Sequence, residues 1–296
     1  MSQSPKPRLG FIGLGLMGQP MSLRLLQAGY PLSVHDRNPE QLTTAIEHGA
    51  QAAATPAEIM TASDIVLLCL VSTDAVVEVT RGPTGLLSTG SAGKLIIDCS
   101  TSEVDTTRQL AAQAASEHYI GWLDAPVSGG PPAAAAGRLT MMAGGSEQDF
   151  ARAQPILREL AEQVTLMGPV GAGQVTKMIN QVLVLNQFCV LAEALKLAEN
   201  NGVDASQIPD CLAGGYADSA MLRQFFPRLL ARDFAPAGYA RQVLKDLDMV
   251  DALAKNSKTP LPMTSQARLL YRLLIARGYS ELDAIAILKL YDSEPL

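Results

Sequence analysis

The sequence has little of what nucleic-acid-binding and metal-binding proteins are built from. Among its 296 residues, 23 Lys and Arg stand against 29 Asp and Glu, and only 18% of the residues are charged. A basic stripe that would bind a phosphate backbone is absent, so we expect no nucleic-acid partner. The 3 histidines and 4 cysteines lack the spacing of a metal site or a disulfide framework. The sequence therefore predicts no bound metal.

Signals for export or membrane insertion are also lacking. Residues 1–8 are polar and lead directly into an apolar strand, without the apolar core of a signal peptide. The most apolar long stretch, 175–198, carries Lys177 and several other polar side chains, which favours a buried helix over a membrane span. Cys69 and Cys99 lie in apolar runs, where cysteine usually behaves as a small hydrophobic residue. We therefore expect a cytoplasmic protein without a membrane partner.

The first half of the chain alternates short apolar runs with helical stretches, of which 18–28, ended by Gly29, is the first. Strands are predicted at 9–12, 32–36, 65–70, 95–98, 122–126, 139–143 and 163–167. The main runs are apolar throughout, as expected when helices cover both faces of a parallel sheet. Residues 1–167 are therefore predicted to form a doubly wound α/β domain of the Rossmann type.

The pattern changes at the glycine-rich run 168–173. From there to Tyr291 only helical periodicity is found, interrupted by turn signals such as Asn201-Gly202 and 260–262. We therefore predict that residues 168–296 form a second, all-helical domain.

A glycine-rich hexapeptide indicates a dinucleotide site. Its residues are Gly13, Leu14, Gly15, Leu16, Met17 and Gly18, a G-x-G-x-x-G pattern that follows a predicted strand and opens a predicted helix. Gly13 would allow the tight turn, Gly15 the approach of a pyrophosphate, and Gly18 close packing of helix on strand.

The next predicted strand ends at Asp36, which bears on the choice of cofactor. Its carboxylate can accept hydrogen bonds from ribose hydroxyls and would repel a 2′-phosphate, which favours NAD. Arg37 could instead pair with that phosphate or lie over the adenine, so NADP remains the alternative.

Hydride transfer to or from an alcohol carbon requires a group that takes or gives a proton. None of the three histidines lies in a promising setting: His35, His48 and His118. Lys177 is the better candidate, because a helix N-terminus and partial burial would lower its pKa. Asn180 and Gln181 follow it on the same helix face. On spacing alone, a lysine with its stem along apolar surface and two polar neighbours explains the pattern at least as well.

Four motifs cover nearly the whole chain: Phe11–Gly18, Asp124–Gly130, Gly171–Gln181 and Lys245–Leu247. In these motifs and in their order, the chain resembles the β-hydroxyacid dehydrogenases, the family of 3-hydroxyisobutyrate dehydrogenase and tartronate semialdehyde reductase (2-hydroxy-3-oxopropionate reductase). Each motif alone is unspecific, whereas the four together are highly specific.

The resemblance implies roles for the residues that match these motifs. Lys177 would be the catalytic acid/base and Asn180 would orient the substrate, with Gln181 where some relatives have a second Asn. Ser128, Gly129 and Gly130 would clamp the substrate carboxylate, as a hydroxyl and successive glycine N–H groups can do.

The cofactor side is implied in the same way. Thr101 matches a residue near the nicotinamide, and Lys245 matches a lysine that reaches the cofactor. Without the resemblance, Lys245 and Asp248 would read as an ordinary exposed ion pair. Leu70 and Val71 stand where many relatives have a Leu-Pro run.

We therefore predict an NAD-dependent oxidoreductase that acts on a small 3-hydroxycarboxylate, without a metal, as a homodimer or homotetramer. The best substrate candidates are tartronate semialdehyde with glycerate, and 3-hydroxyisobutyrate; serine and threonate are alternatives. Imine reductases and non-catalytic dinucleotide-binding proteins are more distant alternatives, because both would be expected to lack the lysine. A 6-phosphogluconate dehydrogenase would be much longer, and a scaffolding role would leave the motifs unexplained.

Overall fold

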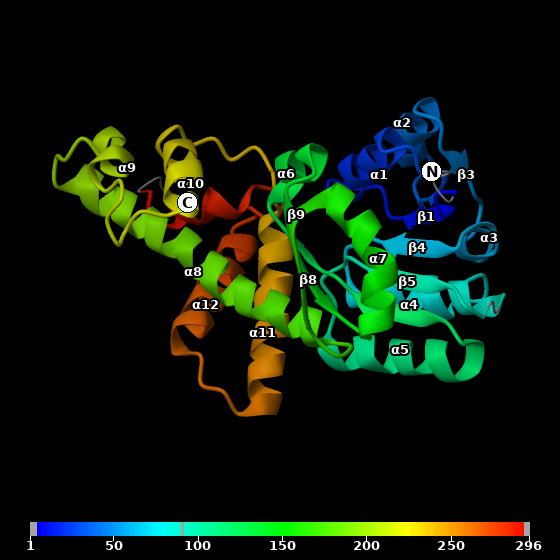
Figure 1. Ribbon diagram of the computed structural model, residues 1–296. Coiled ribbons are helices and arrows are strands. Elements are labelled where there is room, and N and C mark those ends of the chain that lie inside the picture. Colours follow the sequence, from blue (N-terminus) through cyan, green and yellow to red (C-terminus); the bar gives the residue numbers. More distant parts are fainter. Residues whose placement is uncertain (1–4, 90–91, 293–296) are drawn as a thin grey trace. The chain divides into compact units, whose positions relative to one another are not determined.

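A computed structural model describes residues 5–89 and 92–292 of the chain (Figure 1). The chain divides into two compact units, Met1–Lys177 and Met178–Leu296. We describe each unit by itself.

The first unit is built on one mixed sheet. Its strands are β1 (Leu9–Ile12), β2 (Leu32–His35), β3 (Gln51–Ala52), β4 (Ile65–Leu68), β5 (Leu95–Asp98), β6 (Gly121–Asp124), β7 (Val127–Ser128), β8 (Leu139–Gly144) and β9 (Ala161–Gly168). Their order is β3-β2-β1-β4-β5-β6-β8-β7, with β9 paired to β8. The strands from β3 to β6 run parallel, whereas β8 is antiparallel to β6 and β7. The order 3-2-1-4-5-6 is that of the Rossmann fold, as predicted.

Helices connect these strands. They are α1 (Gly18–Gln27), the 3₁₀ turn η1 (Pro39–Gln41), α2 (Leu42–Glu47), α3 (Pro56–Ala62), α4 (Thr73–Arg81), η2 (Leu86–Ser88), α5 (Val104–His118), α6 (Gly130–Ala136) and α7 (Glu147–Leu160). Their starts follow local sequence signals: the side chains of Thr55, Ser72 and Ser146 each accept a backbone N–H of the first turn.

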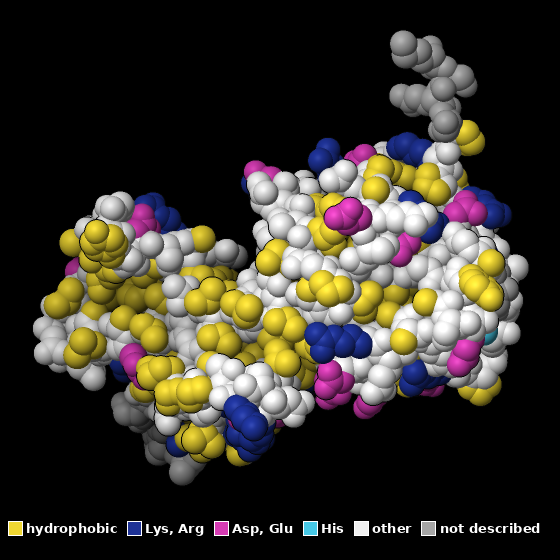
Figure 2. Space-filling model, turned by 60° about the horizontal axis from the view of Figure 1, so that its bottom comes forward, with side chains coloured by type: hydrophobic (Ala, Val, Ile, Leu, Met, Phe, Trp, Pro, Cys, Tyr) yellow, Lys and Arg dark blue, Asp and Glu magenta, His cyan; other side chains and the backbone are white. Residues whose placement is uncertain are grey.

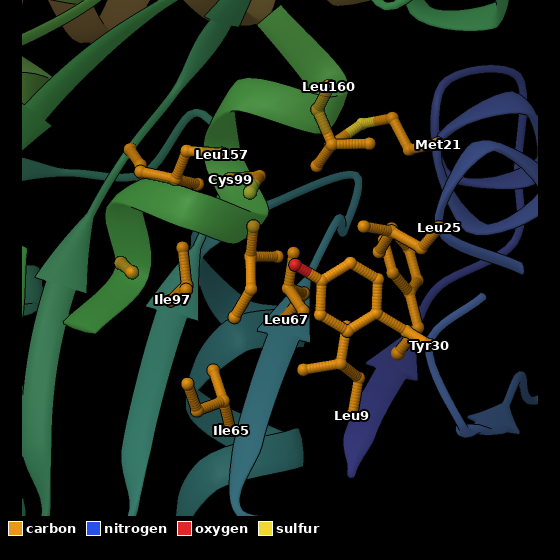
Figure 3. Close-up of a cluster of buried hydrophobic side chains, with 14 of the residues drawn as sticks. Leu9, Met21, Leu25, Tyr30, Ile65, Leu67, Ile97, Cys99, Leu157 and Leu160 are labelled. Atoms are coloured by element: carbon orange, nitrogen blue, oxygen red, sulfur yellow. The ribbon is translucent and has the colours of Figure 1, made fainter. Parts of the chain in front are cut away.

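Both faces of this sheet are buried, as the uniformly apolar strands predicted. Ile65 and Leu67 belong to one buried cluster, and Val66 and Leu68 to another. Because successive side chains of a strand point to opposite faces, the two clusters lie on the two sides of the sheet. Figure 3 shows the first cluster, in which strand residues such as Leu67 meet side chains of α1 and α7.

Three strands end earlier than predicted, and each early end has a local cause. β2 stops at His35, because the Asp36 side chain turns to the Gly13–Gly18 loop. β4 stops at Leu68, and the Leu70 N–H bonds to the Ser100 hydroxyl instead of a neighbouring strand. The predicted strand 122–126 stops at Asp124 as β6, where the Asp124 carboxylate accepts the N–H groups of Gly171 and Gln174, and β7 is a separate strand that was not predicted.

The second unit is helical, as predicted. It contains most of α8 (Ala172–Asn200), followed by η3 (Ala205–Gln207), α9 (Ile208–Cys211), α10 (Ala220–Leu230), α11 (Ala240–Ser257), α12 (Pro262–Ala276) and η4 (Ala284–Leu290). Over its described part, 178–292, the only strand-like pairing is one isolated bridge between Tyr239 and Asp283. Its core is a single buried cluster that includes Phe226 and Tyr271.

Helix α8 runs through the boundary between the units. We predicted a domain boundary after residue 167, whereas the division into compact units falls after Lys177. The first turns of α8 pack closely on the sheet, since a Cβ on Gly173 would lie 2.4 Å from the Met142 carbonyl oxygen. The first six residues of the helix therefore belong to the first unit.

Among the helices of the described residues, α8 alone is long and apolar enough to cross a membrane. By length and mean hydropathy, α8 could therefore cross a membrane despite its polar side chains. This is weak evidence for a span, since a core helix of a globular protein passes the same test. Leu185, Ala192 and Leu195 of α8 are indeed part of the buried cluster of the second unit.

Candidate active site

The Gly13–Gly18 loop connects β1 to α1 and has the geometry of a phosphate-binding turn. Gly13 has a φ of 95°, and a Cβ there would lie 2.4 Å from the Cys69 carbonyl oxygen. A Cβ on Gly18 would lie 1.8 Å from the Gly13 carbonyl oxygen, so both positions require glycine. A Cβ on Gly15, in contrast, would meet nothing within 4 Å. The loop is tight at both ends and open at Gly15, which suits the approach of a pyrophosphate.

Asp36 holds this loop to the end of β2. One carboxylate oxygen accepts the Leu14 N–H at 2.7 Å, and the other accepts the Asn38 N–H at 2.8 Å. A carboxylate has about four acceptor positions, so capacity remains for ribose hydroxyls. The side chain is only half-buried, and the neighbouring Arg37 is exposed.

The loops after β4 and β5 are tied to each other. The Leu70 N–H donates to the Ser100 hydroxyl at 2.9 Å, while Val71 is exposed and Thr101 half-buried. These loops, the Gly13–Gly18 loop and Asp36 all follow the carboxyl ends of neighbouring parallel strands. Ligands of such sheets bind at this edge, where the strand order reverses, here between β1 and β4.

The Ser128-Gly129-Gly130 run follows β6 at the same edge. Its two glycines have positive φ angles, 130° at Gly129 and 72° at Gly130. Only glycine adopts two such conformations in succession without strain. A Cβ on Gly130 would have no neighbour nearer than 3.9 Å, so the position has open space around it. The run therefore exposes backbone that a side chain would otherwise cover.

Lys177 lies beside this run. It is 7% exposed, and its ammonium donates to the Val127 carbonyl oxygen at 2.8 Å. Val127 directly precedes Ser128, so the structure brings the predicted acid/base and the predicted carboxylate clamp together within the first unit. The long spacing in sequence, 50 residues between Lys177 and Val127, is closed by folding.

The start of α8, which carries Lys177, is held by a buried polar network that our sequence analysis did not assign. Asp124 accepts the N–H groups of Gly171 at 2.7 Å and Gln174 at 2.9 Å. The Gln174 amide in turn accepts the Ser102 N–H at 3.1 Å and donates to the Ser100 carbonyl at 2.9 Å. The network links the loop after β5 to the helix of Lys177. A signal was present, since Asp124 ends a buried strand, and buried charges need partners.

Two carboxyl groups of this network have perturbed acidity. Burial, with a smaller contribution from the charge of Asp124, raises the pKa of Asp98 to about 7 against the lowering effect of the hydrogen bonds from Ser100 and Ser102. Burial also raises the pKa of Asp124, while the N–H groups that it accepts lower it. Both groups therefore hold a proton more strongly than an exposed Asp does.

The remaining predicted site residues lie in the second unit. On α8, Asn180 is half-buried and Gln181 is 7% exposed, and the Asn180 amide donates to the Gln181 amide oxygen at 2.9 Å. On α11, Lys245 forms an ion pair with Asp246 at 3.2 Å. Asp248 pairs with Arg268 and Arg272.

The cysteines are free thiols, and burial raises the pKa of Cys69 to about 12 and that of Cys99 well above its ordinary value. Across 5–89 and 92–292, no three His, Cys, Asp or Glu side chains are grouped to hold a metal. The geometry of the first unit thus defines a Rossmann-type dinucleotide-binding protein with a lysine beside a glycine-rich turn.

Comparisons with known proteins agree with this class. The family model of the NAD binding domain of 6-phosphogluconate dehydrogenase matches residues 8–168. The model described as the NAD-binding domain of NADP-dependent 3-hydroxyisobutyrate dehydrogenase matches residues 171–291.

Relatives match the chain over nearly its whole length. The chain is 34% identical to an NAD-dependent L-serine dehydrogenase of Pseudomonas aeruginosa, over 96% of this chain and 98% of that protein. It is 35% identical to a 2-hydroxy-3-oxopropionate reductase of Escherichia coli, over 95% and 96%. The solved structure of a 3-hydroxyisobutyrate dehydrogenase of Mycobacterium tuberculosis with L-serine has a TM-score of 0.87 and 30% identity, over 97% and 100%.

The chain belongs to the β-hydroxyacid dehydrogenase family, as its motifs predicted. Its relatives are oxidoreductases that act on hydroxyl groups, and its cofactor is a nicotinamide dinucleotide.

Proposed function

We propose that this protein is an NAD-dependent dehydrogenase that interconverts a small 3-hydroxycarboxylate and the corresponding aldehyde. The observation that carries the proposal is the position of Lys177, whose ammonium lies at the Val127 carbonyl next to Ser128-Gly129-Gly130. A proton-transfer group and an anion-binding turn are what a hydroxyacid substrate requires.

In this proposal Lys177 is the acid/base. It takes the proton of the substrate hydroxyl on oxidation and returns one to the developing alkoxide on reduction. The bound dinucleotide supplies or accepts the hydride at its nicotinamide ring. The hydrogen bond to the Val127 carbonyl oxygen holds the Lys177 ammonium beside Ser128. Asp124 and Gln174 keep the first turn of α8, and with it the lysine, against the sheet.

Ser128, Gly129 and Gly130 receive the substrate carboxylate. Both glycines have positive φ angles, and neither carries a Cβ that would cover its backbone. Asn180, which follows Lys177 on α8, orients the substrate with Gln181 beside it, and Thr101 and Lys245 contact the cofactor. These roles follow from the family motifs and are supported by the positions of Lys177 and Gly130.

NAD is the preferred cofactor in this proposal. The support is Asp36, which ends β2 and has acceptor capacity left after binding Leu14 and Asn38. A carboxylate at this place binds the ribose hydroxyls and repels a 2′-phosphate. The exposed Arg37 is the feature that would favour NADP.

Tartronate semialdehyde with glycerate and 3-hydroxyisobutyrate are the first substrate candidates. L-serine is a second candidate, because one relative is named an L-serine dehydrogenase and one similar structure contains L-serine. Threonate shares the same carboxylate and β-hydroxyl. Lys177 disfavours an imine reductase or a non-catalytic dinucleotide-binding protein, both of which would be expected to lack this lysine.

The test is a turnover assay with the purified chain. Glycerate, 3-hydroxyisobutyrate, L-serine and threonate are each supplied with NAD or NADP, and the reverse reaction is run with tartronate semialdehyde and NADH. We expect one of these pairs to give kcat/KM in the usual range of enzymes, about 10⁴–10⁸ M⁻¹s⁻¹. Absence of turnover with every pair contradicts the proposal.

Self-association through the second unit is part of the proposal. Exposed apolar side chains follow one face of α8 at spacings of four and seven residues: Ile179, Leu183, Val190 and Leu197. Hydrophobic side chains also lie next to one another on the surface of the second unit in Figure 2. A repeat of seven is typical of helices that pair with a second helix, here one from a second copy. Light scattering of Leu183→Lys against the wild type tests this: a smaller mass for the variant supports a dimer or tetramer.

The same proposal places the protein in the cytoplasm without nucleic-acid or membrane partners. Its support is the net charge of −6 and the four free thiols. Cell fractionation tests it.

A further inference from the structure

Three polar side chains of the second unit form a chain of hydrogen bonds that begins at a carboxylate. Asp246 of α11 accepts the Gln181 amide N–H at 2.5 Å, and the Gln181 oxygen accepts the Asn180 amide N–H at 2.9 Å. Gln181 and Asp246 are 7% and 9% exposed. The second oxygen of Asp246 lies 3.2 Å from the Lys245 ammonium. Gln181 and Asp246 are thus buried partners, and Asn180 is half-buried at the end of the chain of hydrogen bonds.

The chemistry of Asp246 determines the direction of this chain. Its carboxylate pairs with the Lys245 ammonium, and a carboxylate can only accept hydrogen bonds. Gln181 must therefore present its NH₂ group to Asp246, which turns its oxygen to Asn180. Asn180 must then present its own NH₂ group to Gln181, which turns its oxygen away from Gln181. Shape alone does not determine which way either amide faces, because exchanging the oxygen and the NH₂ group of an amide changes its shape very little.

We infer that Asp246 is a positioning residue that acts through Gln181 to direct the amide oxygen of Asn180 at the substrate. Asn180 then offers an acceptor, which recognises a hydrogen-bond donor of the substrate, a hydroxyl or an ammonium group. The inference rests on the proposed function, in which Asn180 orients the substrate. Gln181 then transmits the effect of Asp246 to Asn180, and Asp246 does more than form an ion pair with Lys245.

Two single variants separate this role from packing. Asp246→Asn keeps the size of the side chain but can donate or accept, so the direction of the chain is lost. Asp246→Glu adds a methylene but remains a group that only accepts. We expect the substrate KM to rise about 10-fold in Asp246→Asn, the cost of one misdirected hydrogen bond, and to rise less in Asp246→Glu. If Asp246 only filled space, the order would be reversed, and the substrate KM would rise less in Asp246→Asn than in Asp246→Glu.

A paired exchange supplies the sharpest test. Gln181→Glu alone places a second carboxylate against Asp246, so we expect KM to rise there as well. In the double variant Gln181→Glu with Asp246→Asn, the new amide on α11 donates to the new carboxylate on α8, and that carboxylate accepts from Asn180. The direction at Asn180 is restored, and we expect KM to return to within about 3-fold of the wild type. If the increases in substrate KM of the two single variants instead add up in the double variant, the inference is overturned.

Two controls accompany these variants. Asp248→Asn makes the same change two residues further along α11, at a carboxylate that pairs with Arg268 and Arg272, and should leave KM unchanged. The affinity for NADH is measured by fluorescence titration in every variant. A loss of NADH affinity in Asp246→Asn with an unchanged substrate KM would mean that Asp246 acts through Lys245, which overturns the inference. A wild type that turns over no hydroxyacid refutes the proposed function itself, before any variant is compared.

Discussion

The acidity of Asp98 leads to a pH dependence of stability that can be calculated from its surroundings. Asp98 is fully buried at the end of β5, and burial raises its pKa to about 7. An Asp in an unfolded chain titrates near pH ~3.9. Between these values the folded chain holds a proton that the unfolded chain has released. The stability that this proton supplies is complete below about pH 4 and is lost as the pH rises through about 7.

The variant Asp98→Asn isolates this effect. The amide is close in shape to the protonated acid: its oxygen can accept the Ser100 N–H, as Asp98 does at 2.9 Å, and its NH₂ can donate to the Ser102 hydroxyl. It does not titrate. A difference of about 3 pH units, at about 1.4 kcal/mol per unit, corresponds to about 4 kcal/mol. We expect the variant to gain free energy of unfolding relative to the wild type by up to this amount between about pH 4 and 7, and to gain no more above it.

Urea unfolding of both proteins at several pH values between 5 and 8, followed by circular dichroism, measures this difference. Asp64→Asn is the control, because Arg8 hydrogen-bonds to Asp64 and lowers the pKa of that carboxyl. In that variant the sign is reversed: the wild type should keep a constant advantage between pH 5 and 8 and lose it only as the pH falls below about 4. A difference between Asp98→Asn and the wild type that stays constant or shrinks with rising pH refutes the assignment of a raised pKa to Asp98.

Three further predictions concern the active site. Lys177→Ala should lower kcat by about 10²–10⁴ with NADH affinity nearly unchanged. Turnover near that of the wild type in steady-state kinetics would show that Lys177 is not the acid/base. Gly130→Val should raise the substrate KM strongly, because valine is strained at a φ of 72° and its side chain would cover the backbone of the run, while NADH affinity in a fluorescence titration should change little. Loss of NADH binding instead would mean that the run binds the cofactor. Asp36→Ser should weaken NAD and relatively favour NADP in paired KM measurements, and a wild type that already prefers NADP would contradict the weight given to Asp36.

Much of the fold could be predicted because its signals are local. Apolar runs such as 95–97 indicate strands that are buried on both faces, and the observed β5, Leu95–Asp98, contains those residues. Asn38 and Thr55 accept backbone N–H groups at the starts of η1 and α3, and each directly precedes a proline, which is a local signal for the start of a helix. Strand ends were predicted less well, because a strand stops where its backbone N–H groups find other partners, as that of Leu70 does.

The sequence by itself determined the family, the glycine turn at Gly13–Gly18 and the candidacy of Lys177, since each depends on residue types at short spacing. Only the tertiary structure decided how these residues are held. Asp124 caps the start of α8 across 47 and 50 residues of chain, and Asp246 contacts Gln181 across 65. Burial gives these polar contacts their strength, because a buried carboxylate without a partner is costly. Burial arises only when distant segments pack, so no local pattern could predict that Asp124 would accept backbone N–H groups of α8 and Asp246 the amide of Gln181.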